Sequence, residues 1–257
     1  MTKAQIKSMR RMSDITPERL EVLNSGNAET TVLTECLAVD FAKLMQDAFP
    51  HISERTCCEM TGAAKTGITN RMALAAQLLL REDNIPLSEL STHTSDMIRG
   101  WACYSIAQQN MLSLPEKLEQ IRSLADDSHF GVREWAWLAM RGDIIAQPEL
   151  SFALLQPWTD DPSDKIRRFA CEAVRPRGVW CAHFNLLKTQ PELALPILEA
   201  LRNDPAIYVQ DSVANWLNDA SKTTPQWVQE LCARWLRESP TPATARICKR
   251  ALRTINK

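Results

Sequence analysis

Acidic, amide and arginine side chains recur at helical spacing in three segments of the second half of the sequence. Residues three, four or seven apart share one face of an α-helix, so each set would present its polar groups together. The sets are Glu134, Trp137 and Arg141; Arg168, Glu172 and Arg175; and Asp211, Asn215 and Asn218, with Asp219 beside them. Stacking the three helices would form a groove with carboxylates and amides at its centre and arginines alongside. Carboxylates there could stabilise a developing positive charge, and arginines could bind phosphates.

A proline follows the second set directly. Pro176 disfavours α-helical geometry at Arg175, the residue before it, so the chain must leave the helix there. Arg175 and Arg177 then lie at a helix end, and Trp180 lies just beyond.

The helices that carry these sets belong to a repeat. The stretches IRGWA at 98–102, VREWA at 132–136 and IRRFA at 166–170 begin at two equal steps of 34 residues, close to the period of helix-pair solenoids. A weaker copy, VQDSV at 209–213, follows after 43 residues, as an insertion in one loop would produce, and ICKRA at 247–251 resembles a degraded last copy. The alternative is a set of unrelated amphipathic helices.

Each clear copy has a physical reading. The Val or Ile and the Ala are four residues apart, so they share a helix face and should pack inward. An acidic turn precedes each copy, and its Asp can cap the next helix. The repeat arginine faces elsewhere and could pair with the Asp of a neighbouring copy. The fold class predicted is therefore all-α, an α-α superhelix (solenoid) of HEAT-like repeats with a concave groove.

Helices are also predicted before the repeats. The Thr16-Pro17-Glu18 stretch has the N-cap and N1-proline pattern of a helix start. Apolar spacing predicts helices over 31–49 and 69–81. We expect a single domain over 1–257, with an N-terminal helical cap over 1–85 and repeats over 86–257.

Composition excludes several classes of protein. Only 7 glycines occur in 257 residues and no alternating strand pattern is present, which argues against an all-β fold. The 8 cysteines show no CxxC pair and the 4 histidines no i,i+4 pair, so we expect neither a disulfide framework nor a metal site. The first residues lack the apolar core of a secretory signal, so we expect none. The sequence has no run of about 18 apolar residues, so we also expect no membrane-spanning helix.

Charge is uneven along the chain. The net charge is −1, but the stretches 165–188 and 231–257 are locally basic. Local charge, not the sum, decides whether a protein binds nucleic acid, so a DNA partner stays possible.

Five stretches resemble the AlkC/AlkD superfamily of alkylated-base DNA glycosylases, and its AlkC branch most. FGVREWAW at 130–137 is similar to the first motif, RRFACEAVRPRGVW at 167–180 to the second and YVQDSVANWLND at 208–219 to the third. LTECLAVDFA at 33–42 is similar to the family's opening helix, and ALRT at 251–254 to the end of its repeat domain. We expect no immunoglobulin-like domain of the kind that some members carry at the C-terminus.

The resemblance implies HEAT-like repeats around double-stranded DNA and excision of cationic bases such as 3-methyladenine or 3-methylcytosine, without extrusion into a deep pocket. It assigns the catalytic carboxylates to Glu134 and Asp219, with Trp180 or Trp137 offering an aromatic face. The residues expected to bind DNA are Arg168, Arg175, Arg177, Asn215, Asn218 and Lys222. We expect no cofactor, a monomer, and a cytoplasmic, nucleoid-associated location in a bacterium.

Simpler roles stay open for the same residues. Glu134 could be a surface acid paired with Arg141, Asp219 could brace a loop to Lys222, and Arg175 could bind a helix C-terminus. Two other functions also stay open: a non-catalytic HEAT-repeat protein that binds DNA structure, and a peptide-binding scaffold.

Overall fold

The structure is a computed structural model that describes residues 11–82 and 85–255. The first ten residues, where we expect no secretory signal, and Lys257 of the basic C-terminal stretch lie outside the described residues. The described parts of the chain are helical and contain no strand. None of the helices described is long and apolar enough to cross a membrane.

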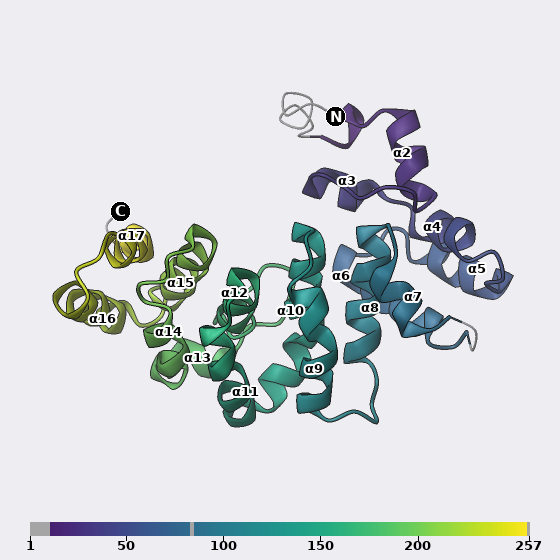
Figure 1. The fold of residues 1–257 in the computed structure, drawn as a ribbon. Helices are drawn as coiled ribbons and strands as arrows, with labels where there is room; N and C mark the ends of the chain where they lie inside the picture. Colours follow the sequence, from purple (N-terminus) through teal and green to yellow (C-terminus); the bar gives the residue numbers. More distant parts are fainter. Residues whose placement is uncertain (1–10, 83–84, 256–257) are drawn as a thin grey trace. The chain divides into compact units, whose positions relative to one another are not determined.

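The chain divides into two compact units. Unit 1 comprises Met1–Leu112 and Asp127–Ala139, and unit 2 comprises Ser113–Asp126 and Met140–Lys257. The helix α10 crosses the boundary between them (Figure 1). The expected single domain, with a cap over 1–85, stays a prediction.

The helices follow one another with short connections. Their bounds, in chain order, are η1 Met12–Asp14, α2 Pro17–Asn24, α3 Leu33–Ala38, α4 Phe41–Ala48, α5 Glu54–Gly62, α6 Ile68–Leu79, α7 Leu87–Thr92, α8 Asp96–Ala107, α9 Leu114–Ala125, α10 Phe130–Ala146, α11 Pro148–Leu155, η2 Gln156–Asp160, α12 Asp164–Glu172, α13 Asn185–Thr189, η3 Pro191–Ala194, α14 Leu195–Ala200, α15 Ile207–Ala220, α16 Pro225–Glu238, α17 Pro242–Ala251 and η4 Leu252–Thr254.

The N-terminal helices agree with the predicted starts, with one correction. Thr16 caps α2 by accepting a hydrogen bond from the Arg19 N–H, and α6 covers nearly all of the helix expected over 69–81. The helix expected over 31–49 is wrong as a single helix, because Asp40 starts a new one. Its side chain accepts hydrogen bonds from the N–H groups of Ala42 and Lys43, which makes it the N-cap of α4.

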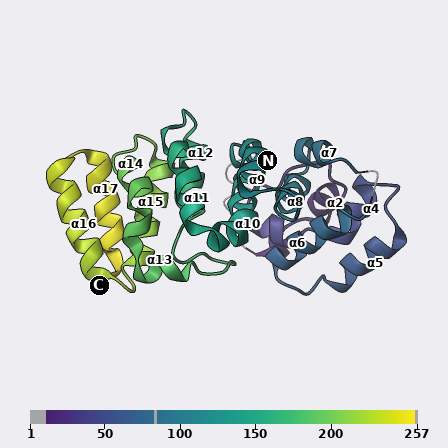
Figure 2. The same cartoon turned by 90° about the horizontal axis from the view of Figure 1, so that it is seen from below.

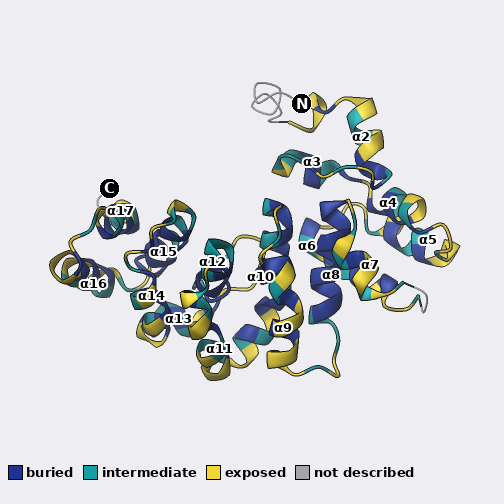
Figure 3. Cartoon of the chain, viewed as in Figure 1, coloured by how far each residue is buried: buried dark blue, intermediate teal, exposed yellow. Residues whose placement is uncertain are grey.

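The repeat motifs lie on α8, α10, α12, α15 and α17. The Val or Ile and the Ala of the three clear copies are at most 2% exposed, which confirms that they pack inward. In unit 2, α12 packs on α15 and α15 on α17, and the three lie side by side (Figures 1 and 2). In unit 1, α8 packs against α6 and α7 and is buried over nearly its whole length (Figure 3). The fold is a HEAT-like helical repeat.

The repeat arginines bind the turn before their own helix and the Asp of the next copy. Arg99 Nε and Nη2 donate to Asp127 Oδ2 and Oδ1 at 2.8 and 3.1 Å, and its Nη1 donates to two carbonyls of the preceding turn. Arg167 does the same with Asp204, at 2.6 and 3.1 Å. The predicted pairing of arginine with a neighbouring Asp is confirmed in these copies. In the weaker copy, Gln210 donates to the carbonyl of Asp204 at 2.8 Å in place of the arginine.

Candidate active site

Glu134 lies on α10, in unit 1, with its carboxylate held by a tryptophan one turn further along. The indole Nε1 of Trp137 donates to Glu134 Oε2 at 2.8 Å. Glu134 is half-buried, whereas Trp137 is only 4% exposed. The ring of Trp137 therefore packs in the core and offers its N–H, rather than its face, to the site.

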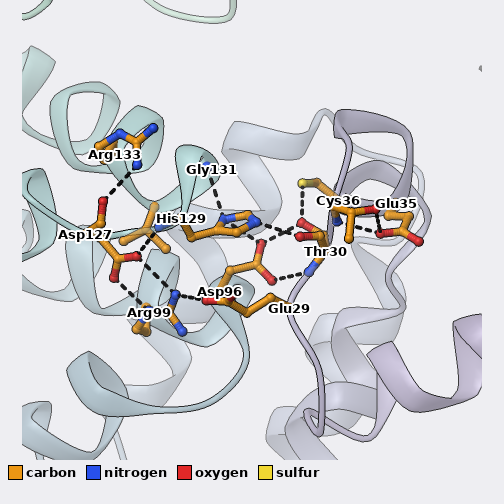
Figure 4. A network of polar contacts seen from close by, with 12 residues as sticks. Glu29, Thr30, Glu35, Cys36, Asp96, Arg99, Asp127, His129, Gly131 and Arg133 are labelled. Atoms are coloured by element: carbon orange, nitrogen blue, oxygen red, sulfur yellow. Dashed lines mark hydrogen bonds and ion pairs between the residues drawn. The ribbon is translucent and has the colours of Figure 1, made fainter. Parts of the chain in front are cut away.

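The start of α10 is fixed by a polar network that the sequence did not reveal (Figure 4). Asp96, which is fully buried, accepts hydrogen bonds from the N–H and the hydroxyl of Thr30, both at 2.8 Å. His129 Nδ1 accepts from the Gly131 N–H at 3.1 Å, so Nε2 carries the proton and donates to the Thr30 carbonyl at 2.7 Å. This network ties the first turn of the helix that bears Glu134 to distant segments of unit 1.

In unit 2 a second cluster forms around Arg175. Its Nη2 lies 2.6 Å from Asp219 Oδ2, and its Nη1 lies 3.0 Å from Glu172 Oε2. Lys222 Nζ lies 2.9 Å from Asp219 Oδ1, and Arg168 Nη2 lies 3.5 Å from Glu172 Oε1. The structure thus brings together four residues predicted for the site, Arg168, Arg175, Asp219 and Lys222, in one network of ion pairs that also includes Glu172.

Glu172 is the residue that the sequence-based assignment did not select. It is only 2% exposed. Burial by itself would raise the pKa of Glu172, but the charges of Arg168 and Arg175 outweigh burial and hold the pKa below its ordinary value. Its position one turn from Arg168 and from Arg175 was visible in the sequence, but its burial was not.

Trp180 lies on the helix-free segment that follows α12. Its side chain is 46% exposed, and its φ of 63° is in the left-handed region. A bulky side chain seldom adopts that conformation, which costs roughly 1–3 kcal/mol and is often found at functional sites. Two aromatic side chains, Trp137 and Trp180, were expected at the site. Of the two, Trp180 is the one with an accessible ring. Arg177 lies on the same segment and is half-buried.

The two asparagines predicted for DNA binding hold α15 against the C-terminal helices. Asn218 is buried, and its amide donates to the carbonyl of Ala251 at 3.0 Å and to the hydroxyl of Thr254 at 2.8 Å. Asn215 Oδ1 accepts from Arg253 Nη2 at 2.9 Å. Both amides are engaged within the fold.

The position after the repeat arginine differs in every copy. A Cβ on Gly100 would lie 2.6 Å from Trp135 Cδ1, so packing requires glycine there. Arg168 stacks over the ring of Tyr208 at 4.4 Å, and Asp211 pairs with Arg246 at 2.7 Å. In the copy at 132–136 this position is Glu134, whose carboxylate accepts a hydrogen bond from the indole of Trp137.

Glu134 and Trp137 belong to unit 1, whereas the other predicted site residues belong to unit 2. Their convergence in one groove stays a prediction. Within the described residues, His, Cys, Asp and Glu side chains form no group that could hold a metal ion.

Comparison with known proteins supports the resemblance in sequence. Residues 135–246 match the model of a family described as DNA alkylation repair enzyme. This part of the chain is similar to that family. A curated relative, the uncharacterized protein YhaZ of Bacillus subtilis, is 36% identical to this chain over 139 residues. The aligned region covers 54% of this chain and 38% of YhaZ, so the chain spans less than half the length of that relative.

Solved structures show the same fold. The alkylpurine DNA glycosylase AlkC of Pseudomonas fluorescens, bound to DNA containing an abasic site analog, matches 97% of this chain with a TM-score of 0.69 and 23% identity. The chain covers 66% of that AlkC. AlkD2 of Streptococcus mutans matches 84% of this chain with a TM-score of 0.57 and 18% identity, and the chain covers 98% of it.

Proposed function

We propose that this protein is a monofunctional DNA glycosylase that removes cationic N-alkylated bases, of the 3-methyladenine or 3-methylcytosine type, from double-stranded DNA. The observation that carries the proposal is the carboxylate of Glu134, half-buried and oriented by the Trp137 N–H. The similarity of residues 135–246 to the family described as DNA alkylation repair enzyme supports it. A surface acid that only aids solubility needs no such support.

The proposed chemistry follows from the charge of the lesion. Alkylation at a ring nitrogen makes the base cationic, so it can leave without a general acid. The N-glycosidic bond breaks, its electron pair goes to the base and cancels the ring charge, and the sugar gains oxocarbenium character. Glu134 stabilises that charge and orients the water that bonds to C1′, as carboxylates do in glycoside hydrolysis. The water's proton passes to the carboxylate or to solvent, so the reaction needs no cofactor.

We assign DNA recognition to unit 2. Trp180 supplies an accessible ring for cation–π attraction to the charged base or sugar. Lys222, whose side chain is 43% exposed, and Arg177 are the cations of this unit that we expect at phosphates. The proposal further includes a concave groove that takes duplex DNA without extrusion of the base, action as a monomer, and a cytoplasmic location with the bacterial DNA.

The test is release of methylated bases from duplex DNA treated with a methylating agent. Wild-type protein should release them, and Glu134→Gln, which keeps the size and the Trp137 contact but loses the charge, should slow release about 100-fold. Glu149→Gln removes an exposed carboxylate of α11 and is the matched control, expected to act as the wild type does. Release by Glu134→Gln at the wild-type rate would refute the role of Glu134.

A second candidate is supported by the partners of Asp219. Both of its oxygens are engaged, one by Arg175 and the other by Lys222, which suits a carboxylate that shapes a binding surface. On this reading the protein binds DNA structure without catalysis. Wild-type protein that binds duplex DNA, with affinity that falls steeply with salt, yet releases no base would favour this candidate.

A further inference from the structure

Arg141, on α10 within unit 2, is a buried arginine with an uncommon set of partners. It is only 2% exposed. Its Nε donates to the carbonyl of Ala182 at 3.1 Å, its Nη1 to that of Ala173 at 2.7 Å and its Nη2 to that of Arg175 at 2.5 Å. All three carbonyls belong to the segment 173–182, so one guanidinium donates hydrogen bonds to both ends of that segment.

Burying this charge has a cost that the partners do not cancel. The carbonyl acceptors are neutral, and burial lowers the pKa of Arg141. The ring of Phe184, 5.5 Å from the guanidinium carbon, offers cation–π attraction in compensation. A planar guanidinium spreads five donors over three nitrogens and can bind carbonyls that lie apart, whereas a lysine presents its three donors from a single nitrogen. The residue type is therefore matched to the task of holding a loop.

The held segment is the one that carries Trp180. Trp180 is exposed and has a left-handed φ of 63°, a conformation that persists only where the surroundings impose it. Beside the three Arg141 bonds, the Phe184 N–H donates to the Pro176 carbonyl at 3.1 Å and closes the segment. These contacts fix both ends of the stretch while leaving Trp180 46% exposed.

We propose that Arg141 is a positioning residue, which fixes the 173–182 segment so that Trp180 is held ready to contact DNA. The contact of Trp180 with DNA rests on the proposed function, whereas the fixing of the segment does not. The two parts therefore need separate tests.

Limited digestion with trypsin tests the first part without DNA. The segment contains one cleavable bond, Arg177–Gly178, because trypsin does not cut between Arg175 and Pro176. Arg141→Met should speed cleavage at that bond about tenfold or more, since each lost charge-assisted hydrogen bond favours the open segment. Arg141→Lys, which keeps the charge but reaches fewer carbonyls, should lie between Arg141→Met and the wild type.

Arg122→Met is the matched control. Arg122 is also an arginine of unit 2, with a side chain that is 40% exposed; it is paired with Asp161 and lies 5.0 Å from the ring of Trp158. Its loss should leave cleavage after Arg177 unchanged. Wild-type cleavage in Arg141→Met, or equal acceleration in Arg122→Met, would overturn the proposal.

A double-mutant cycle on release of methylated bases tests the second part. Arg141→Met and Trp180→Ala should each lower the rate by a similar factor, and Arg141→Met should lower it less than about twofold further once Trp180 is absent. Equal factors in both backgrounds would show that Arg141 does not act through Trp180, and would overturn that part. If the wild type releases no base, the proposed function fails, and the digestion alone decides whether Arg141 fixes the segment.

Discussion

Replacing Arg167 tests whether the repeat arginine stabilises the fold through the Asp of the next copy. Its guanidinium binds both oxygens of Asp204, at 2.6 and 3.1 Å, and donates to the carbonyls of Asp161 and Pro162 at 2.8 and 3.1 Å. Asp204 is 6% exposed. Arg167→Met keeps much of the volume, removes all four bonds and leaves a buried carboxylate without its cation.

The magnitude follows from that unpaired charge. Breaking a buried ion pair from one side costs about 3–5 kcal/mol, most of it from the charge left behind. Asp204→Asn in the Arg167→Met background removes this charge and retains an oxygen for the Ala206 N–H, which now donates to Asp204 Oδ1 at 2.8 Å. The double variant should therefore regain about 1–2 kcal/mol, although Asp204→Asn alone should destabilise the protein.

Urea unfolding followed by tryptophan fluorescence measures these differences in the free energy of unfolding. Arg55→Met is the control, because Arg55 forms an i,i+4 pair while its side chain is 84% exposed, and its loss should cost less than about 0.5 kcal/mol. If Asp204→Asn fails to raise the free energy of unfolding of Arg167→Met, the unpaired carboxylate of Asp204 is not the cause of the lost stability. The electrostatic account of the repeat arginine would then be wrong.

Three further outcomes are expected. Gly100→Ala should lower the melting temperature. A Cβ 2.6 Å from Trp135 Cδ1 costs about 1–3 kcal/mol, which exceeds the gain of about 1 kcal/mol from the higher helix propensity of alanine. A higher melting temperature would contradict the packing argument. Trp137→Phe should slow base release about tenfold with circular dichroism unchanged, because Glu134 loses its 2.8 Å donor; an unchanged rate would show that the indole does not orient Glu134. Against the effect of burial, Arg168 and Arg175 hold the pKa of Glu172 below its ordinary value, so its contribution to stability is present above the ordinary pKa and is lost as pH falls through the lowered one. Glu172→Gln should accordingly show a flatter loss of stability in acid than the wild type, and equal slopes would count against the ion pairs.

The repeat and its packing could be predicted from the sequence because they depend on neighbours along one helix. Val132 and Ala136 are four residues apart, and that spacing alone places them on one face. The pairing of Arg99 with Asp127 and of Arg167 with Asp204 could also be predicted, because a repeat places equivalent residues next to each other. The single helix expected over 31–49 is wrong because the Asp40 side chain caps a new helix, and apolar spacing alone does not reveal such a break.

The candidate site depended on contacts between residues far apart in sequence. The sequence supplied Glu134, Asp219 and Trp180 as types with suitable chemistry, and family resemblance selected them. It could not show that Trp137 turns its N–H rather than its face to Glu134, because a rotamer is chosen by the packing around it. It offered Lys222 as a partner of Asp219, which the structure bears out, but it could not show that Arg175 binds the same carboxylate.

What the sequence by itself determined about this protein is the helical repeat, its period and the positions left free for function, because these follow from periodicity and side-chain type. The tertiary structure alone decided which polar groups are buried and which residues they contact. Arg141 and Glu172 are both ordinary members of a polar helix face in the sequence, yet one grips a loop and the other lies between two arginines. Burial strengthens such contacts and penalises unpaired charge, and burial depends on every element that packs against a residue.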